Sequence, residues 1–127
     1  MRLLLDTHAL LWWLFAVPQL GPGALAAIGD PESDVYVSAL TAAEIEIKRA
    51  VGKLAVPPDL REQMERNGFT ELPFTIRHGG ALRDLPLHHR DPFDSMLVAQ
   101  ARVEGLTIVT ADKAITPYDV AILPATE

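Results

Sequence analysis

The chain has 127 residues, which suits one domain of roughly 100–200 residues. Its hydrophobic content of 49% allows a buried core, and the absence of cysteine excludes disulfides, zinc–thiolate sites and cysteine nucleophiles. The net charge of −6, from 11 basic and 17 acidic residues, argues against a broad basic surface for binding duplex nucleic acid.

Short apolar segments alternate along the chain with longer segments of helical pattern. The expected strands cover residues 2–5, 35–38, 69–74, 107–109 and 120–123. The expected helices cover residues 7–16, 22–29, 41–51, 57–67, 75–85 and 91–105. Because the strands are almost uniformly apolar, this order predicts an α/β fold with a central parallel sheet of four to five strands flanked by helices. We expect a single domain over residues 1–127.

The N-terminal region gives no sign of targeting or membrane insertion. Asp6 stands where a signal peptide would need an uninterrupted apolar stretch. The longest apolar run, residues 9–17, is too short to span a bilayer and is closed by Pro18. We therefore expect a soluble cytoplasmic protein with no membrane partner.

Four acidic residues stand near the expected carboxyl edge of the sheet, where ligands bind in folds of this kind. They are Asp6 after the first strand, Glu44 after the second, and Asp94 and Asp112 on either side of the fourth. Two of them also fall on apolar stripes of helices. Their stripe neighbours are Ile47 and Val51 for Glu44, and Leu97, Val98 and Ala101 for Asp94.

A carboxylate held against a core needs a compensating partner, and neither stripe contains a basic residue. A divalent cation would meet that need. Hard oxygen ligands without cysteine favour Mg²⁺ or Mn²⁺, which can orient water for attack on a phosphodiester and stabilise the leaving oxygen. His88 and His89 are adjacent, and adjacent side chains rarely face the same ion. We therefore expect these two histidines to contact solvent or phosphate.

Each acid also has an ordinary structural interpretation. Residues 41–44 have the form of a helix capping box, and residues 91–94 resemble one. Asp6 could cap the first helix, and Asp112 could shape a turn. These alternatives hold one by one, but they explain less well why four such residues converge on one edge.

The first helix carries further residues of interest. One of Trp12 and Trp13 is expected in the core and the other half-exposed, and His8 is expected to be packed or hydrogen-bonded. The apolar side chains exceed what one buried face needs, so some are expected to form a groove for a partner helix. They are Leu11, Trp12, Leu14 and Phe15.

Four segments together resemble the motif regions of PIN-domain proteins, in the order and spacing of that family. They are residues 3–8, 38–48, 89–94 and 107–112. The Asp-Thr-His at residues 6–8 and the Asp-Pro-Phe-Asp at residues 91–94 are similar to those of VapC-type toxins. The resemblance implies a Mg²⁺- or Mn²⁺-dependent endoribonuclease, the toxin of a type II toxin–antitoxin pair. It also implies a homodimer, an RNA substrate and a cognate antitoxin whose C-terminal segment covers the acidic site.

The resemblance also assigns roles to residues. Asp6, Glu44, Asp94 and Asp112 correspond to the family's acidic quartet, with all four expected to be catalytic and to face the metal. Asp6 and Asp94 resemble the direct ligands, Asp112 lies close by, and Glu44 positions a metal-bound water or a second ion. Thr110 is expected to support the site by hydrogen bonding.

Asp91 is expected to act as a helix cap that supports the site rather than as a ligand. The candidate RNA contacts are Lys48, Arg49, Lys53, Arg90, Arg102 and Lys113. Three positions depart from the family pattern: Ala43, expected to alter core packing where tryptophan is common, Ser95 in place of arginine, and Ile115 in place of phenylalanine.

Two other functions compete with the nuclease. A phosphatase of the haloacid dehalogenase type also has an aspartate after its first strand, but it requires a second one two residues later, where this chain has His8. A PIN-like module that binds RNA or protein without cleavage typically lacks one or more of the acids. All four are present here.

Overall fold

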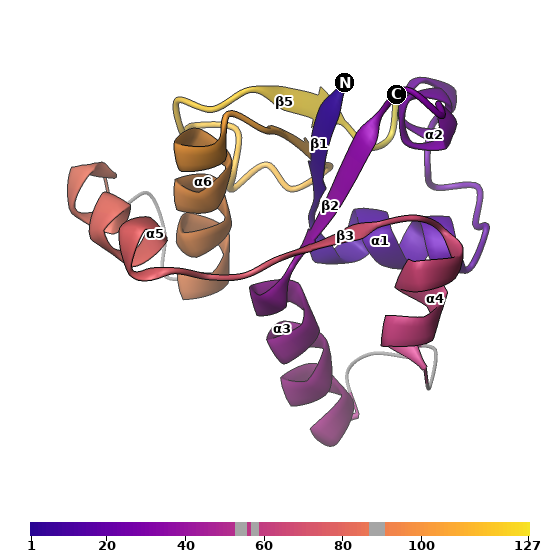
Figure 1. Cartoon of the computed structure of the whole chain (residues 1–127), viewed down its shortest axis with the longest axis horizontal. Helices are drawn as coiled ribbons and strands as arrows, with labels where there is room; N and C mark the ends of the chain where they lie inside the picture. The colour runs from indigo at the N-terminus through magenta and orange to yellow at the C-terminus, as the bar shows by residue number, and fades with distance from the viewer. Residues whose placement is uncertain (53–55, 57–58, 87–90) are drawn as a thin grey trace.

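The computed structural model describes residues 1–52, 56, 59–86 and 91–127. The strands are β1 (Arg2–Leu5), β2 (Asp34–Ser38), β3 (Thr70–Leu72), β4 (Thr107–Thr110) and β5 (Ile122–Pro124). They form one parallel sheet in the order β3-β2-β1-β4-β5 (Figure 1). The predicted α/β class and parallel sheet are confirmed. β3 is shorter than expected because Pro73, which has no N–H to donate, follows Leu72.

The helices are α1 (Thr7–Leu14), α2 (Pro22–Gly29), α3 (Ala39–Ala50), α4 (Leu60–Arg66), α5 (Ile76–Ala81) and α6 (Pro92–Glu104), with a 3₁₀ turn at Leu82–Asp84. α6 begins after Asp91, whose side chain accepts from the Phe93 N–H, and ends at Gly105 with φ of 68°. Both ends follow the local signals read from the sequence.

α3 begins two residues earlier than expected. Its N-cap is Ser38, whose hydroxyl accepts from the Leu40 N–H at 3.0 Å. The capping-box interpretation of residues 41–44 is therefore wrong, and Glu44 lies inside the helix. The interpretation failed because a serine ending a strand can also cap the helix that follows it directly.

The sheet separates two layers of helices, as the alternation along β1 shows. Leu3 and Leu5 belong to a buried cluster with residues of α1, α2 and α3, whereas Leu4 belongs to a second cluster with residues of α6. In Figure 1, α1 and α6 lie at different sides of the central strands. The burial of both faces explains why the strands are almost continuously apolar.

The two layers are tied together close to the carboxyl edge of the sheet. Gln100 of α6 is fully buried, and its side-chain oxygen accepts from the hydroxyl of Ser38 at 2.5 Å. Its amide nitrogen donates to the carbonyl of Pro73 at 3.2 Å. The start of α3 and the segment after β3 are thereby held against α6.

Several expectations about helix surfaces are corrected. Ile47 and Val51 are 57% and 64% exposed, so the face of α3 that carries them is not a core stripe. Ala43 is exposed and alters no core packing. Trp12 and Trp13 are both half-buried against the same cluster, rather than one buried and one half-exposed. Among the described residues, no helix has the length and apolar character needed to cross a membrane.

Candidate active site

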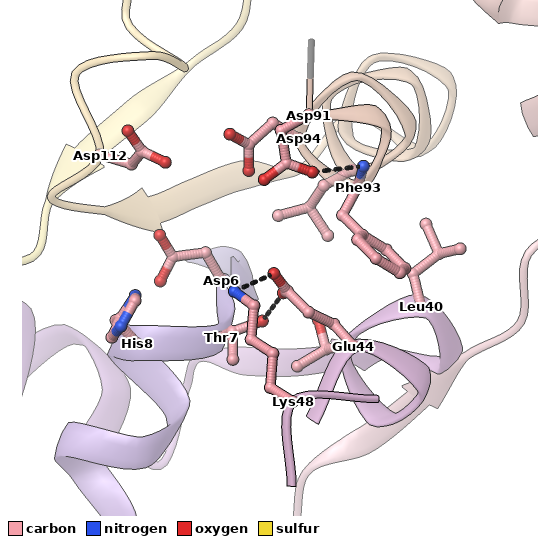
Figure 2. Close-up of a pocket in the computed structure, with 12 residues that line it drawn as sticks. Asp6, Thr7, His8, Leu40, Glu44, Lys48, Asp91, Phe93, Asp94 and Asp112 are labelled. Carbon is pink, nitrogen blue, oxygen red and sulfur yellow. Dashed lines mark hydrogen bonds and ion pairs between the residues drawn. The ribbon is translucent and has the colours of Figure 1, made fainter. Parts of the chain in front are cut away.

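A cavity of about 70 Å³ opens at the carboxyl ends of β1, β2 and β4, where α1, α3 and α6 begin. Figure 2 shows acidic side chains from these separate elements directed toward one another across it. The residues that line it are Asp6, Thr7, His8, Leu40, Thr41, Glu44, Lys48, Asp91, Phe93, Asp94, Leu97 and Asp112.

Asp6 is held in place by neutral hydrogen-bond donors. It follows β1 directly and caps α1, with Oδ1 accepting from the Ala9 N–H at 2.8 Å. Oδ2 accepts from the hydroxyl of Thr110 at the end of β4. Asp6 is only 8% exposed, and burial raises the pKa of its carboxyl despite these hydrogen bonds. Asp6 is thus a helix cap and also part of the cavity wall.

Thr110 connects two of the acids. Besides donating to Asp6, its hydroxyl oxygen accepts from the Asp112 N–H at 2.9 Å. Asp112 in turn shapes the following turn, because its Oδ1 accepts from the Ala114 N–H at 2.9 Å. The turn-forming interpretation of Asp112 and its position in the wall of the cavity are therefore compatible.

Asp94 lies in the first turn of α6, with its carboxyl half-buried in the cavity. Burial, followed by the nearby carboxylates of Asp91, Asp112 and Glu44, raises the pKa of Asp94 to about 7. Like charges therefore crowd this side of the cavity. A bound cation would offset both the cost of burying the charged carboxylate and the repulsion between the carboxylates.

Glu44 is compensated in a different way. It is 8% exposed, its Oε1 accepts from the hydroxyl of Thr7, and its Oε2 pairs with Lys48 Nζ at 2.8 Å. The expectation that no basic residue reaches Glu44 is wrong. Lys48 stands one turn later at the i,i+4 spacing, which the stripe through Ile47 and Val51 leaves out. The hydrogen bond to Glu44 raises the pKa of Lys48, so its ammonium stays charged.

The other basic candidates are less close to the cavity. Arg49 pairs with Glu46 at 3.3 Å on the exposed side of α3. Lys113 and Arg102 are exposed, and neither is among the described residues that line the cavity. The remaining candidates lie outside the described residues: Lys53, His88, His89 and Arg90.

Sequence reasoning missed part of the wall. His8 is exposed and lines the cavity, and its ring also lies beside that of Trp12, with the centroids 6.0 Å apart. Thr7 hydrogen-bonds Glu44. Leu40 and Phe93 supply an apolar side. The position of Thr7 and His8 directly after Asp6 was a usable signal, since a helix starting at the sheet edge presents its first turn to that edge.

The donor set matches the chemistry of a hard divalent cation. Carboxylate oxygens are the ligands that Mg²⁺ and Mn²⁺ prefer. Burial raises the pKa values of Asp6 and Asp94, with neighbouring carboxylates adding to the shift, and a bound cation would favour the charged forms. As placed, no three acidic or histidine side chains within the described ranges are already close enough to hold a metal ion. Binding would require the carboxylates to draw together across the cavity.

The PIN domain family model matches residues 3–121. A similar solved structure is VapBC2 from Rickettsia felis bound to a promoter DNA fragment, with TM-score 0.71, 14% identity, and coverage of 97% of this chain and 98% of that one.

Two further similar structures are FitAcB from Neisseria gonorrhoeae and FitAB bound to a DNA fragment named IR36. FitAcB has TM-score 0.63, 24% identity and coverage of 97% of both chains. FitAB has TM-score 0.63, 21% identity and coverage of 98% of this chain and 96% of that one. At these identities the likeness is one of fold. The search of curated proteins finds no match. The family match, which extends over nearly the whole chain, shows that this protein belongs to the PIN domain family.

Proposed function

We propose that this PIN domain is a metal-dependent endoribonuclease that hydrolyses RNA phosphodiester bonds. One observation carries the proposal: acids from three separate strand ends meet at one cavity, where burial and mutual repulsion raise the pKa values of Asp6 and Asp94. Membership of the PIN family supports a nuclease, and it favours this function over the haloacid dehalogenase phosphatase.

In this proposal Asp6, Asp94 and Asp112 hold Mg²⁺ or Mn²⁺, and Glu44 faces the same cavity. The bound cation would supply positive charge to orient water and stabilise the leaving oxygen. Asp6 keeps its orientation through Thr110 and the Ala9 N–H. Asp94, whose pKa is raised, would be one of the residues that hold the cation, and a bound cation would favour its charged form. The fixed donors reduce the reorganisation that the reaction requires.

We propose that Lys48, Arg49, Arg90 and Lys113 contact the phosphates of the RNA. Lys48 lines the cavity, and Lys113 follows Asp112 directly on an exposed turn. Arg49 lies one residue beyond Lys48 on α3, and Arg90 immediately precedes Asp91 in the sequence. Since the chain is acidic as a whole, local contacts of this kind would have to provide the phosphate binding.

We further propose that the protein is the homodimeric toxin of a type II toxin–antitoxin pair. Support comes from the resemblance at residues 6–8 and 91–94 and from the fold shared with VapBC2 and FitAB. An apolar groove of about 460 Å³ beside α1 suits a partner helix. Its lining residues are Trp12, Trp13, Ala16, Val17, Pro18, Leu20 and Leu25.

This partner proposal can be tested by binding. Trp12→Ala should weaken the affinity for the product of the neighbouring gene, with light scattering used to check the dimer. Equal affinity in wild type and variant would assign Trp12 to packing alone.

The nuclease proposal is tested by calorimetric titration of Mg²⁺ and Mn²⁺ into wild type and Asp94→Asn, with cleavage of total RNA assayed in the same samples. We expect saturable binding and metal-dependent cleavage in wild type, and loss of both in the variant. Binding without cleavage would point to a non-catalytic module or to a narrow target absent from the assay. No binding in either protein would return the four acids to their roles as caps and turn formers.

A further inference from the structure

Lys48 brings a positive charge into the acidic cavity from within the chain. Its Nζ lies 2.8 Å from Oε2 of Glu44, and its side chain is 35% exposed against 11% for Glu44. The carboxylates of Asp91 and Asp94 also act electrostatically on this ammonium. Arg49, the next residue, pairs with Glu46 on the exposed side of the helix instead.

We propose that Lys48 takes the place of a second metal ion, so that the protein binds one divalent cation per chain and Glu44 is not a ligand. The inference rests on the proposed function, because it concerns the same metal site. It assigns Lys48 as a positioning residue that neutralises Glu44, in addition to any contact with phosphate.

The contacts of Glu44 argue against its being a metal ligand. Both of its carboxylate oxygens are engaged, Oε1 by the Thr7 hydroxyl and Oε2 by Lys48. Thr7 is itself buried and lies beside Asp6 at the start of α1. Each oxygen keeps a further lone pair, but a divalent cation bound to Glu44 would lie close to the Lys48 ammonium, 2.8 Å from Oε2. The two positive charges would repel each other in a largely buried position, where solvent screens them little.

The position of Lys48 relative to the other carboxylates also argues against a second metal ion. Two-metal sites hold their ions about 3.5–4 Å apart, bridged or flanked by carboxylates. The Lys48 ammonium lies against Glu44, whereas Thr110 links the carboxyl of Asp6 to the backbone N–H of Asp112. The glutamate also precedes the lysine by four residues, which is the favourable orientation for such a pair on a helix. Among the described residues that line the cavity, Lys48 is the one lysine or arginine, and it lies against Glu44. A divalent ion held by Asp6, Asp94 and Asp112 would then be the other positive charge.

The prediction concerns the number of ions bound. We would titrate Mn²⁺ by calorimetry and record electron paramagnetic resonance spectra of wild type, Lys48→Met, and Lys48→Met combined with Glu44→Gln. We expect one ion per chain in wild type. In Lys48→Met we expect two, with the spectral signature of coupled Mn²⁺ ions, because Glu44 is then left without its ammonium. In the double variant we expect a return to one.

Matched variants separate charge from general perturbation. Lys48→Arg keeps the positive charge and should retain one ion. Arg61→Met removes a basic residue from exposed α4, away from the cavity, and should also retain one. Thermal melting checks that each variant is folded.

The outcomes distinguish the two proposals. Two ions in wild type, or one ion in folded Lys48→Met, would overturn the role of Lys48 while leaving the metal-dependent nuclease intact. No Mn²⁺ binding in wild type would overturn both proposals together.

Discussion

The two sides of the acidic cavity solve the same physical problem differently. On one side, Glu44 is buried but paired with Lys48 and hydrogen-bonded by Thr7. On the other, Asp6 is held by neutral donors, and Asp94 lies among other carboxylates, with the pKa of both raised. The structure thus gives Glu44 a positively charged partner, but it surrounds Asp6 with neutral donors and Asp94 with other carboxylates. A cation bound from solution would favour the charged forms of Asp6 and Asp94.

The two sides of the cavity also differ in whether their buried carboxylates need a ligand. The Glu44 pair is formed within one helix and holds without any ligand. The opposite side joins β1, β4 and α6, and its carboxylates repel one another in the metal-free protein. The following predictions test this difference from the largest expected effect to the smallest.

Asp6→Asn removes a charge from the crowded side while keeping the helix cap, since asparagine is also a good N-cap. We expect RNA cleavage to fall by at least about 1000-fold, equivalent to about 4 kcal/mol in the barrier. Single-turnover cleavage with Mn²⁺ measures it. Asp59→Asn, at the N-cap of α4, is the matched control and should cleave normally. Undiminished cleavage in Asp6→Asn would remove Asp6 from the metal site.

Metal binding should stabilise the folded protein by relieving the repulsion. At a concentration about 100 times Kd, the gain is about 2.7 kcal/mol, or a rise in Tm on the order of 10 °C. Thermal melting with and without Mn²⁺, followed by EDTA, measures it. Asp94→Asn should show a much smaller rise. An equal rise in both proteins would mean that the ion binds elsewhere.

Thr110→Val removes the hydroxyl that orients Asp6 and Asp112 without changing the size of the side chain greatly. Loss of such a supporting hydrogen bond should lower metal affinity by about 10–100-fold. Calorimetry with Mn²⁺ measures it. Thr110→Ser retains the hydroxyl and should bind nearly as tightly as wild type. If valine and serine variants bind equally, the hydroxyl does not position the acids.

The carboxyl of Asp94 should make the metal-free protein less stable as pH rises. Its pKa is about 7 in the folded chain against an ordinary value of 3.8, so the folded state holds the proton more tightly. The free energy of unfolding therefore declines between these two values and is level, for this group, above the higher one.

Asp94→Asn lacks this dependence. In EDTA at about pH 8 it should melt a few °C above wild type, on the order of 1 kcal/mol because solvent screens a half-exposed group. At about pH 4 the difference should nearly vanish. The same difference in Tm at both pH values would show that the pKa of Asp94 is not raised in the folded protein.

Much of the fold was predictable because its signals are local. Apolar runs separated by helical segments indicated a parallel sheet, and Asp91, Pro92 and Gly105 marked the ends of α6. The start of α3 was missed, since Ser38 serves both the strand and the helix cap. The expected groupings of Glu44 with Ile47 and Val51 failed because helical periodicity does not say which face meets the core.

What the sequence by itself determined is the set of acids and the edge of the sheet at which they stand, because strand polarity and chain order bring the ends of β1, β2 and β4 together. Only the tertiary structure decided which oxygens are already occupied. The bond from Thr110 to Asp6 joins residues 104 positions apart, and the bond from Ser38 to Gln100 joins residues 62 apart. Such contacts depend on ångström-scale packing between elements, which no periodicity along the chain encodes.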